Sequence, residues 1–204
     1  MKSWIDPACL EGRTVRLTPL LRKHAGTLWS VGQDPRIWRW WPWRMETAAD
    51  FENIVARALQ WPVTGSGQTF VIEHRDGGEV LGSTSYLNAD VHNLRVEIGA
   101  TWITPAWQRT GVNRESKWLL LQHAFEDLHA NRVEFKTDSR NERSRTALAR
   151  IGAEEEGTLR NHMVCPDGSL RHSTYFSVTV EDWPRVKRHL TGLRDHYPSS
   201  IAKT

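Results

Sequence analysis

The segment 96–113 constrains the fold of this chain more than any other, because an extended stretch ends there at a proline and a helix begins soon afterwards. Alternation between two faces from Val96 to Ile103 predicts a strand that carries Glu97 near its middle. Pro105 lacks an N–H group and fixes its own φ, so regular strand pairing should stop there. We therefore expect this strand to splay from its neighbour near Pro105.

A polar turn follows and leads into an amphipathic helix. Gly111 can adopt a positive φ and lets a ligand approach the backbone closely, and Asn113 is the expected N-cap. Unpaired N–H groups, the positive end of the helix dipole and the Arg109 cation together suit a phosphate or pyrophosphate. The buried face of the helix is expected to carry Trp118, Leu121, Phe125 and Leu128.

The spacing of this turn resembles V-x-P-x-x-[QR]-x-x-G-x-[GA], the signature of the GCN5-related N-acetyltransferase (GNAT) family. The matching positions are Ile103, Pro105, Gln108 and Gly111, and the last position departs from the signature as Asn113. The segments 97–99, 111–113, 119–126 and 141–144 are similar to the branch that contains the RimJ and RimL ribosomal-protein acetyltransferases. The resemblance covers Leu10 to Trp183.

The resemblance implies an α/β (α+β) GNAT fold, in which helices flank a mixed, splayed β-sheet. A single domain is expected over residues 1–204, with a core at about 10–190 and a loose tail at 195–204. Hydrophobic patterns and turn signals agree with this architecture. They predict strands at 14–20, 68–74, 79–87, 132–138, 157–164 and 171–180, and helices at 21–31, 50–61, 144–151 and 183–193, besides the strand and helix described above.

In the family, the polar turn holds acetyl-coenzyme A, the acyl donor, and the resemblance implies the same role here. The expected cofactor-binding residues are Trp102, Ile103, Gln108, Arg109, Thr110, Gly111, Val112, Asn113, Asn141 and Ser144. A backbone N–H near Trp102 and Ile103, left free by the splay, is the expected donor to the thioester carbonyl.

Glu97 is the candidate general base, because it lies beside the expected thioester and RimL-like enzymes carry a glutamate there. The alternative is a structural carboxylate bonded to neighbouring backbone. Many family members have a tyrosine as general acid where this chain has Leu148. The thiolate therefore leaves without a proton, or takes one from Ser144, from water or from another group.

Four tryptophans crowd into positions 38–43, in the connection that helps to wall the acceptor site of the family. We interpret Trp38, Trp40 and Trp41, together with Glu97, as acceptor-binding residues, since aromatic faces attract cations. A small satellite core or a dimer contact explains the same rings equally well.

Composition excludes several other classes. Cys9 and Cys165 are too few for a disulfide framework, and nine histidines without metal-ligand spacing argue against a metal site. A formal net charge of +3 and the absence of an apolar run of about 20 residues give no sign of direct nucleic-acid or membrane binding. The expected location is the cytoplasm.

The sequence thus predicts an acetyl-coenzyme A dependent N-acetyltransferase. Its acceptor is a primary amine, on a protein N-terminus, a lysine or a small molecule, that attacks directly in a ternary complex. The alternative is a coenzyme A binding sensor or scaffold without catalysis. By resemblance alone, a homodimer is also an option.

Overall fold

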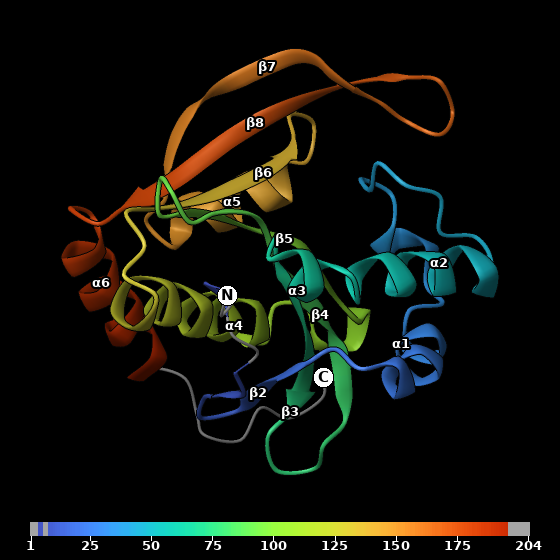
Figure 1. Cartoon of the computed structure of the whole chain (residues 1–204), viewed down its shortest axis with the longest axis horizontal. Helices are drawn as coiled ribbons and strands as arrows, with labels where there is room; N and C mark the ends of the chain where they lie inside the picture. The colour runs from blue at the N-terminus through green and yellow to red at the C-terminus, as the bar shows by residue number, and fades with distance from the viewer. Residues whose placement is uncertain (1–3, 6–7, 196–204) are drawn as a thin grey trace.

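One eight-stranded sheet forms the centre of the computed structural model, which describes residues 4–5 and 8–195 (Figure 1). The strand order is β1-β2-β3-β4-β5-β6-β8-β7, and only β5 and β6 are parallel. This mixed sheet confirms the predicted fold class. The strands are Leu10–Glu11 (β1), Val15–Pro19 (β2), Gln68–His74 (β3), Val80–Asp90 (β4), Arg95–Ile103 (β5), Arg132–Asp138 (β6), Glu154–Val164 (β7) and Leu170–Thr179 (β8).

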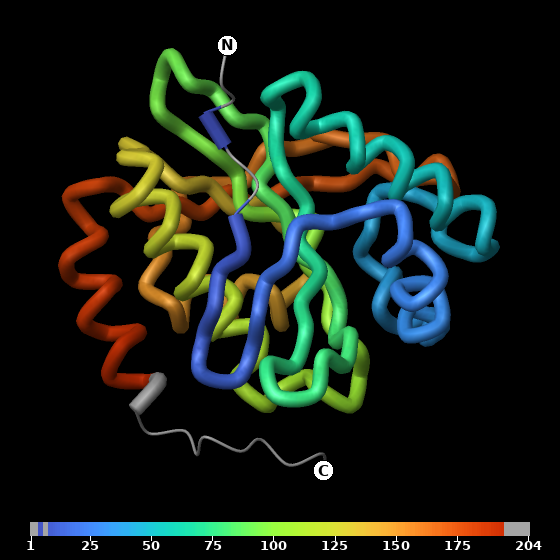
Figure 2. Tube along the Cα trace, turned by 60° about the horizontal axis from the view of Figure 1, so that its bottom comes forward, coloured from blue at the N-terminus to red at the C-terminus, as the bar shows by residue number. Residues whose placement is uncertain are grey.

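Helices cover both faces of the sheet (Figures 1 and 2). Helices α4, α5 and α6 pack on one face, and helices α1 and α2 pack on the other. The helices are Ala25–Val31 (α1), Ala48–Ala58 (α2), Trp61–Thr64 (α3), Val112–Gln122 (α4), Glu142–Arg150 (α5) and Trp183–Asp195 (α6). Within the described residues, no helix is long and apolar enough to cross a membrane.

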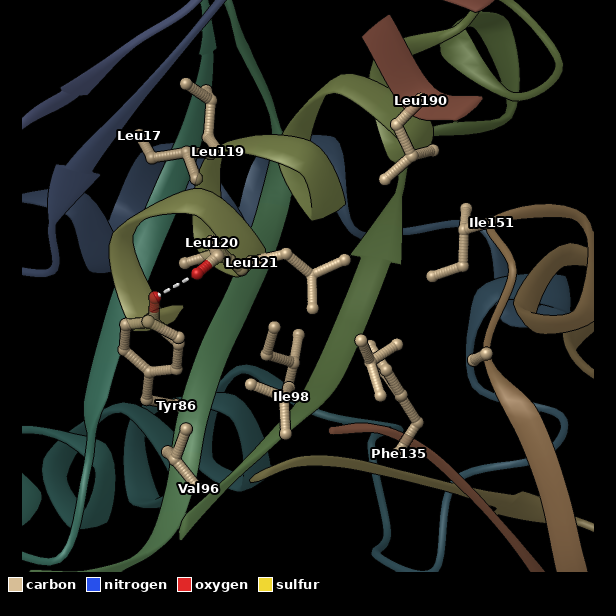
Figure 3. Packing of buried hydrophobic residues seen from close by; sticks show 14 of the residues in the cluster. Leu17, Tyr86, Val96, Ile98, Leu119, Leu120, Leu121, Phe135, Ile151 and Leu190 are labelled. Carbon is tan, nitrogen blue, oxygen red and sulfur yellow. Dashed lines mark hydrogen bonds between the residues drawn. The ribbon is translucent and has the colours of Figure 1, made fainter. Parts of the chain in front are cut away.

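The face under α4 carries the larger hydrophobic cluster (Figure 3). Leu120 and Leu121 of α4 are fully buried against Ile98 of β5 and Phe135 of β6. Burying each leucine stabilises the fold by about 1.5–3 kcal/mol. The Tyr86 hydroxyl of β4 donates a 2.5 Å hydrogen bond to the Leu120 carbonyl, which fixes the helix on the sheet.

Aromatic rings dominate the cluster on the opposite face. The Trp38 ring centroid lies 5.1 Å from that of Trp102 on β5 and 6.3 Å from that of Phe51 on α2. Trp29 of α1 lies 5.9 Å from Phe51 and closes the group. The N-terminal helices are therefore fixed to the sheet through tilted and edge-on rings.

Most predicted elements are confirmed, and their ends shift by a few residues. Strands β3 and β6 occupy the predicted ranges, whereas α2 begins at Ala48 because Thr47 and Asp50 form a capping box. The short elements β1 and α3 were not predicted. The expected tail falls almost wholly on residues 196–204, which lie outside the described residues.

One expectation about α4 was wrong. The N-cap is Gly111, with φ of 96°, and Asn113 already lies inside the helix. The helix runs on into a π-helical turn at His123–Asp127. Of the expected buried face, Leu121 and Phe125 are buried, and Trp118 and Leu128 are partly buried against the same cluster.

Candidate active site

The central feature of the site is a fork between β5 and β6. The two strands pair only from Arg95 opposite Arg132 to Glu97 opposite Glu134, although β5 continues to Ile103. The ladder to β4 on the other side persists as far as Ile103. The strand therefore separates from β6 well before Pro105, and the expected position of the splay is corrected accordingly.

A β-bulge lies inside the fork. Ser85 pairs with Gly99 and Ser83 pairs with Trp102, so Ala100 and Thr101 together face Thr84. Ala100 has a φ of 45°, a left-handed conformation that costs energy for a residue with a Cβ. The bulge changes the direction of β5 at the point where its free edge faces the fork.

The turn after β5 forms a concave group of backbone donors. Arg109 and Gly111 both have positive φ, of 67° and 96°. Among the described residues, no acceptor is recorded for the backbone N–H groups of 109–113. Alternating hands in successive residues at the start of an 11-residue helix form a nest of N–H groups, a conformation that suits an anion.

Side-chain hydrogen bonds fix the conformation of this turn. Gln108 donates through Nε2 to the Ile103 carbonyl at 2.9 Å, and Thr110 donates through Oγ1 to the Trp107 carbonyl at 2.7 Å. Val112 is buried in the larger cluster. The Arg143 guanidinium of α5 donates to Gln108 Oε1 at 2.7 Å, which brings a second cation beside the turn.

The first turn of α5 closes the other side of the fork. Asn141 is the N-cap, and its Oδ1 accepts a hydrogen bond from the Ser144 backbone N–H at 3.1 Å. Both residues follow the end of β6, so they reach the same end of the fork as the polar turn. Leu148, one turn further on, is buried in the larger cluster.

Glu97 is the buried carboxylate at the last paired position of β5, with 4 % of its surface exposed. Its Oε2 accepts a 2.8 Å hydrogen bond from Asn88 Nδ2 and lies 3.4 Å from the Lys136 ammonium. Gly99 leaves room for the carboxylate, since a Cβ there would lie 2.8 Å from Glu97 Oε1. The polar neighbours are side chains, and they hold the carboxylate in one position.

Titratable side chains continue from Glu97 across the next strands. Lys136 of β6 lies 5.9 Å from the Tyr175 ring centroid of β8, and the His162 ring of β7 lies 5.8 Å from Tyr175. Burial raises the pKa of Tyr175 and lowers the pKa of His162. Among the described residues, no group of three or more His, Cys, Asp or Glu side chains could hold a metal ion.

An apolar pocket opens on the α1–α2 face of the sheet and reaches the bulge. Ser85 and Ala100 lie at its sheet side, and Trp41, Trp43 and Trp61 line it. The Trp41 ring packs edge-on against Trp43, with centroids 5.4 Å apart. The pocket and the anion-binding turn thus approach the fork from opposite faces of the sheet.

The three tryptophans named in the sequence analysis take different positions. Trp38 packs within the aromatic cluster, and its indole N–H donates to the Gly32 carbonyl at 2.8 Å. Trp41 lines the pocket. Trp40 lies beneath the guanidinium groups of Arg39 and Arg140, at 4.9 and 5.4 Å from the ring centroid.

Several residues of this region were missed by sequence reasoning. Asn88, Lys136 and Trp61 were not singled out, because only the tertiary fold brings Asn88 and Lys136 to Glu97 and Trp61 to the pocket. One such residue, Lys117 of α4, could have been found from the sequence, because it interrupts the apolar stripe that includes Leu120 and Leu121.

Comparisons with known proteins agree with this geometry. A family model described as "Acetyltransferase (GNAT) domain" matches residues 14–154. The chain is 33% identical over 110 residues, 54% of its length, to YdaF of Bacillus subtilis, whose name describes it provisionally as a ribosomal N-acetyltransferase. It is 25% identical over 119 residues, 58% of its length, to the [Ribosomal protein uS5]-alanine N-acetyltransferase of Escherichia coli.

These alignments span 59% and 61% of the two curated relatives, so the chain matches about three fifths of their length. A solved structure, a GCN5-related N-acetyltransferase from Brucella melitensis, superimposes with a TM-score of 0.86 at 27% identity. That superposition covers 98% of this chain and 91% of the other.

Proposed function

The chain belongs to the GNAT family of acetyltransferases, and on that premise we propose that it transfers an acetyl group from acetyl-coenzyme A to the α-amine of a protein. The observation that carries the proposal is the fork between β5 and β6, with an anion-binding turn at one face and an apolar pocket at the other. A donor and an acceptor can meet there only from opposite sides of the sheet.

The polar turn fits the pyrophosphate of coenzyme A. Its backbone N–H groups have no recorded acceptor among the described residues, and the cations of Arg109 and Arg143 lie beside them. Gln108, Thr110, Gly111, Val112 and Asn113 would form this cradle, and Trp102, Ile103, Asn141 and Ser144 would border the rest of the cosubstrate. Acetyl-coenzyme A would supply the activated thioester.

Glu97 is proposed to receive the proton of the attacking amine, directly or through one water molecule. A free α-amine has a pKa of about 7.7–8.0, so a substantial fraction is already neutral near pH 7. A carboxylate held by Asn88 and Lys136 needs no reorientation before it accepts that proton. The free edge of β5 beyond Glu97 would supply the N–H that polarises the thioester carbonyl.

The acceptor is proposed to enter through the apolar pocket, past Trp41 and Trp43, with Trp38 and Trp40 supporting its rim. The names of the two curated relatives refer to ribosomal acetylation, in one case of an alanine, and this supports a protein acceptor. Aromatic walls favour the amine end of a chain through cation–π attraction, by about 0.5–2 kcal/mol per ring.

A thiol-release assay tests this function. Purified protein is incubated with acetyl-coenzyme A and either peptides that begin with alanine or serine, their Nα-blocked counterparts, or small amines such as spermidine. We expect release with the free peptides and none with the blocked ones. Release with small amines alone would overturn the protein acceptor.

Calorimetry with acetyl-coenzyme A separates the enzyme from a sensor or scaffold. Binding without release for any acceptor would favour the non-catalytic alternative, which the buried Leu148, in place of the tyrosine of many relatives, also suggests. Absence of binding heat would contradict both functions.

A further inference from the structure

Lys117 is a buried lysine that the functions assigned above do not use. It belongs to the second turn of α4, and 6 % of its surface is exposed. Its Nζ donates a 2.8 Å hydrogen bond to Thr101 Oγ1, which is the one bond to it that the described residues provide. An ammonium has three donors, so two are left without an acceptor among the described residues.

The amine lies where the fork opens. Thr101 is the second residue of the β5 bulge, and the Lys117 Nζ also lies 5.7 Å from the ring centroid of Phe135 on β6. Phe135 follows Glu134, the last β6 residue that pairs with β5. Lys117 therefore contacts both strands beyond their last ladder pair, one residue past it on β6 and four residues past it on β5, from the α4 side.

The surroundings of the amine are unusually apolar for a lysine. Within the part of the chain that the structure describes, no carboxylate forms an ion pair with it, and burial alone lowers its pKa to about 7. Its hydrogen-bond partner Thr101 in turn shares a 2.8 Å hydrogen bond with Thr84. A leucine or methionine would fill this place without the cost of burying a charge, so the fold gains no evident stability from the amine.

We propose that Lys117 is the general acid of the acetyl transfer, which donates a proton to the sulfur as coenzyme A departs. This inference rests on the proposed function. The acceptor nitrogen forms the new bond to the acetyl carbon while the carbon–sulfur bond breaks. The proton of the amine goes to Glu97, and a proton of the Lys117 ammonium goes to the sulfur. Exchange with solvent then restores both groups.

The geometry assigns complementary sides to the two groups. Glu97 follows Val96 on the face opposite the α4 cluster, whereas Lys117 reaches β5 from α4 itself. A base on the acceptor side and an acid on the α4 side match a reaction in which the amine enters from one face and the thiol leaves toward the other. Lys117 also supplies the acid that Leu148 cannot.

The first test is the pH profile of kcat for wild type, Lys117→Met and Lys187→Met. Wild-type kcat should fall as pH rises through about 7, because the ammonium loses its proton. Lys117→Met should lower kcat at pH 6.5 by about 100-fold, at the lower end of the range for general acids, and should lack the falling limb. Lys187→Met, which removes a half-exposed surface lysine of α6, is the matched control and should retain the wild-type profile.

The second test measures binding instead of turnover. Calorimetry compares coenzyme A with desulfo-coenzyme A, which lacks the sulfur. Wild type should bind coenzyme A several-fold more tightly than the desulfo compound, and Lys117→Met should bind the two equally. Both proteins should bind acetyl-coenzyme A with similar affinity. Thr101→Val keeps the amine but removes its hydrogen-bond partner, and it should show an intermediate loss of kcat.

A Lys117→Met variant with the wild-type rate and the same falling limb would overturn the assignment of Lys117. An unchanged preference for coenzyme A over the desulfo compound would also contradict it. Either result leaves the acetyltransferase function intact if wild type still releases thiol. By contrast, wild type that neither binds these compounds nor releases thiol would contradict the proposed function itself.

Discussion

The candidate site has two halves, the polar turn after β5 and the apolar pocket on the α1–α2 face of the sheet. The turn presents backbone N–H groups, whereas the pocket presents side chains. The turn depends on two positive φ angles, at Arg109 and Gly111, and on N–H groups at the start of α4. The pocket depends on rings from separate elements, including Trp41 and Trp61. A backbone site is therefore sensitive to conformation, and a side-chain site is sensitive to the residues that line it.

Substitutions should therefore have different consequences in the two halves. Backbone N–H groups are the same in every residue, so the turn can recognise a constant ligand such as pyrophosphate while its exposed side chains change. The pocket is defined by ring shape and position, so substitutions there change which acceptor fits. We expect the donor to be common to the family and the acceptor to be specific to this chain.

The largest effect should come from a charge placed in the backbone half. Gly111→Asp adds a carboxylate beside the N–H groups, at a φ of 96° that residues with a Cβ rarely adopt. We expect acetyl-coenzyme A affinity to fall by at least about 100-fold, or about 2.7 kcal/mol, measured by calorimetry. Gly168→Asp, in the β7–β8 turn with φ of 81°, is the control and should bind normally.

Glu97→Gln tests the point where the two halves meet. The amide keeps the size of the side chain but cannot accept a proton from the amine. We expect kcat to fall by about 100-fold, with acetyl-coenzyme A affinity and thermal stability close to wild type. Full turnover in steady-state kinetics would restrict Glu97 to a structural role.

A smaller effect should follow from a change to the side-chain half. Trp41→Leu removes a ring from the pocket wall, and we expect the KM for a peptide acceptor to rise about two- to fivefold, which corresponds to about 0.5–1 kcal/mol of lost cation–π attraction. The Kd for acetyl-coenzyme A should stay constant. A change in that Kd instead would show that the two halves are not independent.

The smallest expected effect concerns pH and the end of β6. Burial raises the pKa of the Asp138 carboxyl, but hydrogen bonds from Arg140 outweigh burial and hold the pKa below its usual 3.8. The stabilisation is present above the unfolded pKa of about 3.9 and is lost as pH falls through the folded value. Between pH 5 and pH 3, the free energy of unfolding measured in urea should fall more for wild type than for Asp138→Asn. The difference should be under about 1 kcal/mol, because Arg140 is half exposed. Equal losses would exclude this ion pair as a source of acid sensitivity.

Local signals were sufficient for the backbone half. Pro105 predicted where the strand ends, and Gly111 predicted where the turn opens. Proline restricts φ and glycine widens the range of φ, in each case through the residue's own covalent structure. The errors at this level were small: the N-cap is Gly111 instead of Asn113, and the splay begins after Glu97. Sheet register, which involves residues far apart in sequence, decided the second point.

The sequence alone thus determined the mixed sheet and the position of the polar turn, and it pointed to Glu97 as the candidate carboxylate. Only the tertiary structure decided which groups surround that carboxylate, which tryptophans line the pocket, and that the amine of Lys117 lies at the opening of the fork. Backbone conformation follows from neighbouring residues, whereas the burial and charge state of a side chain depend on the distant elements packed around it.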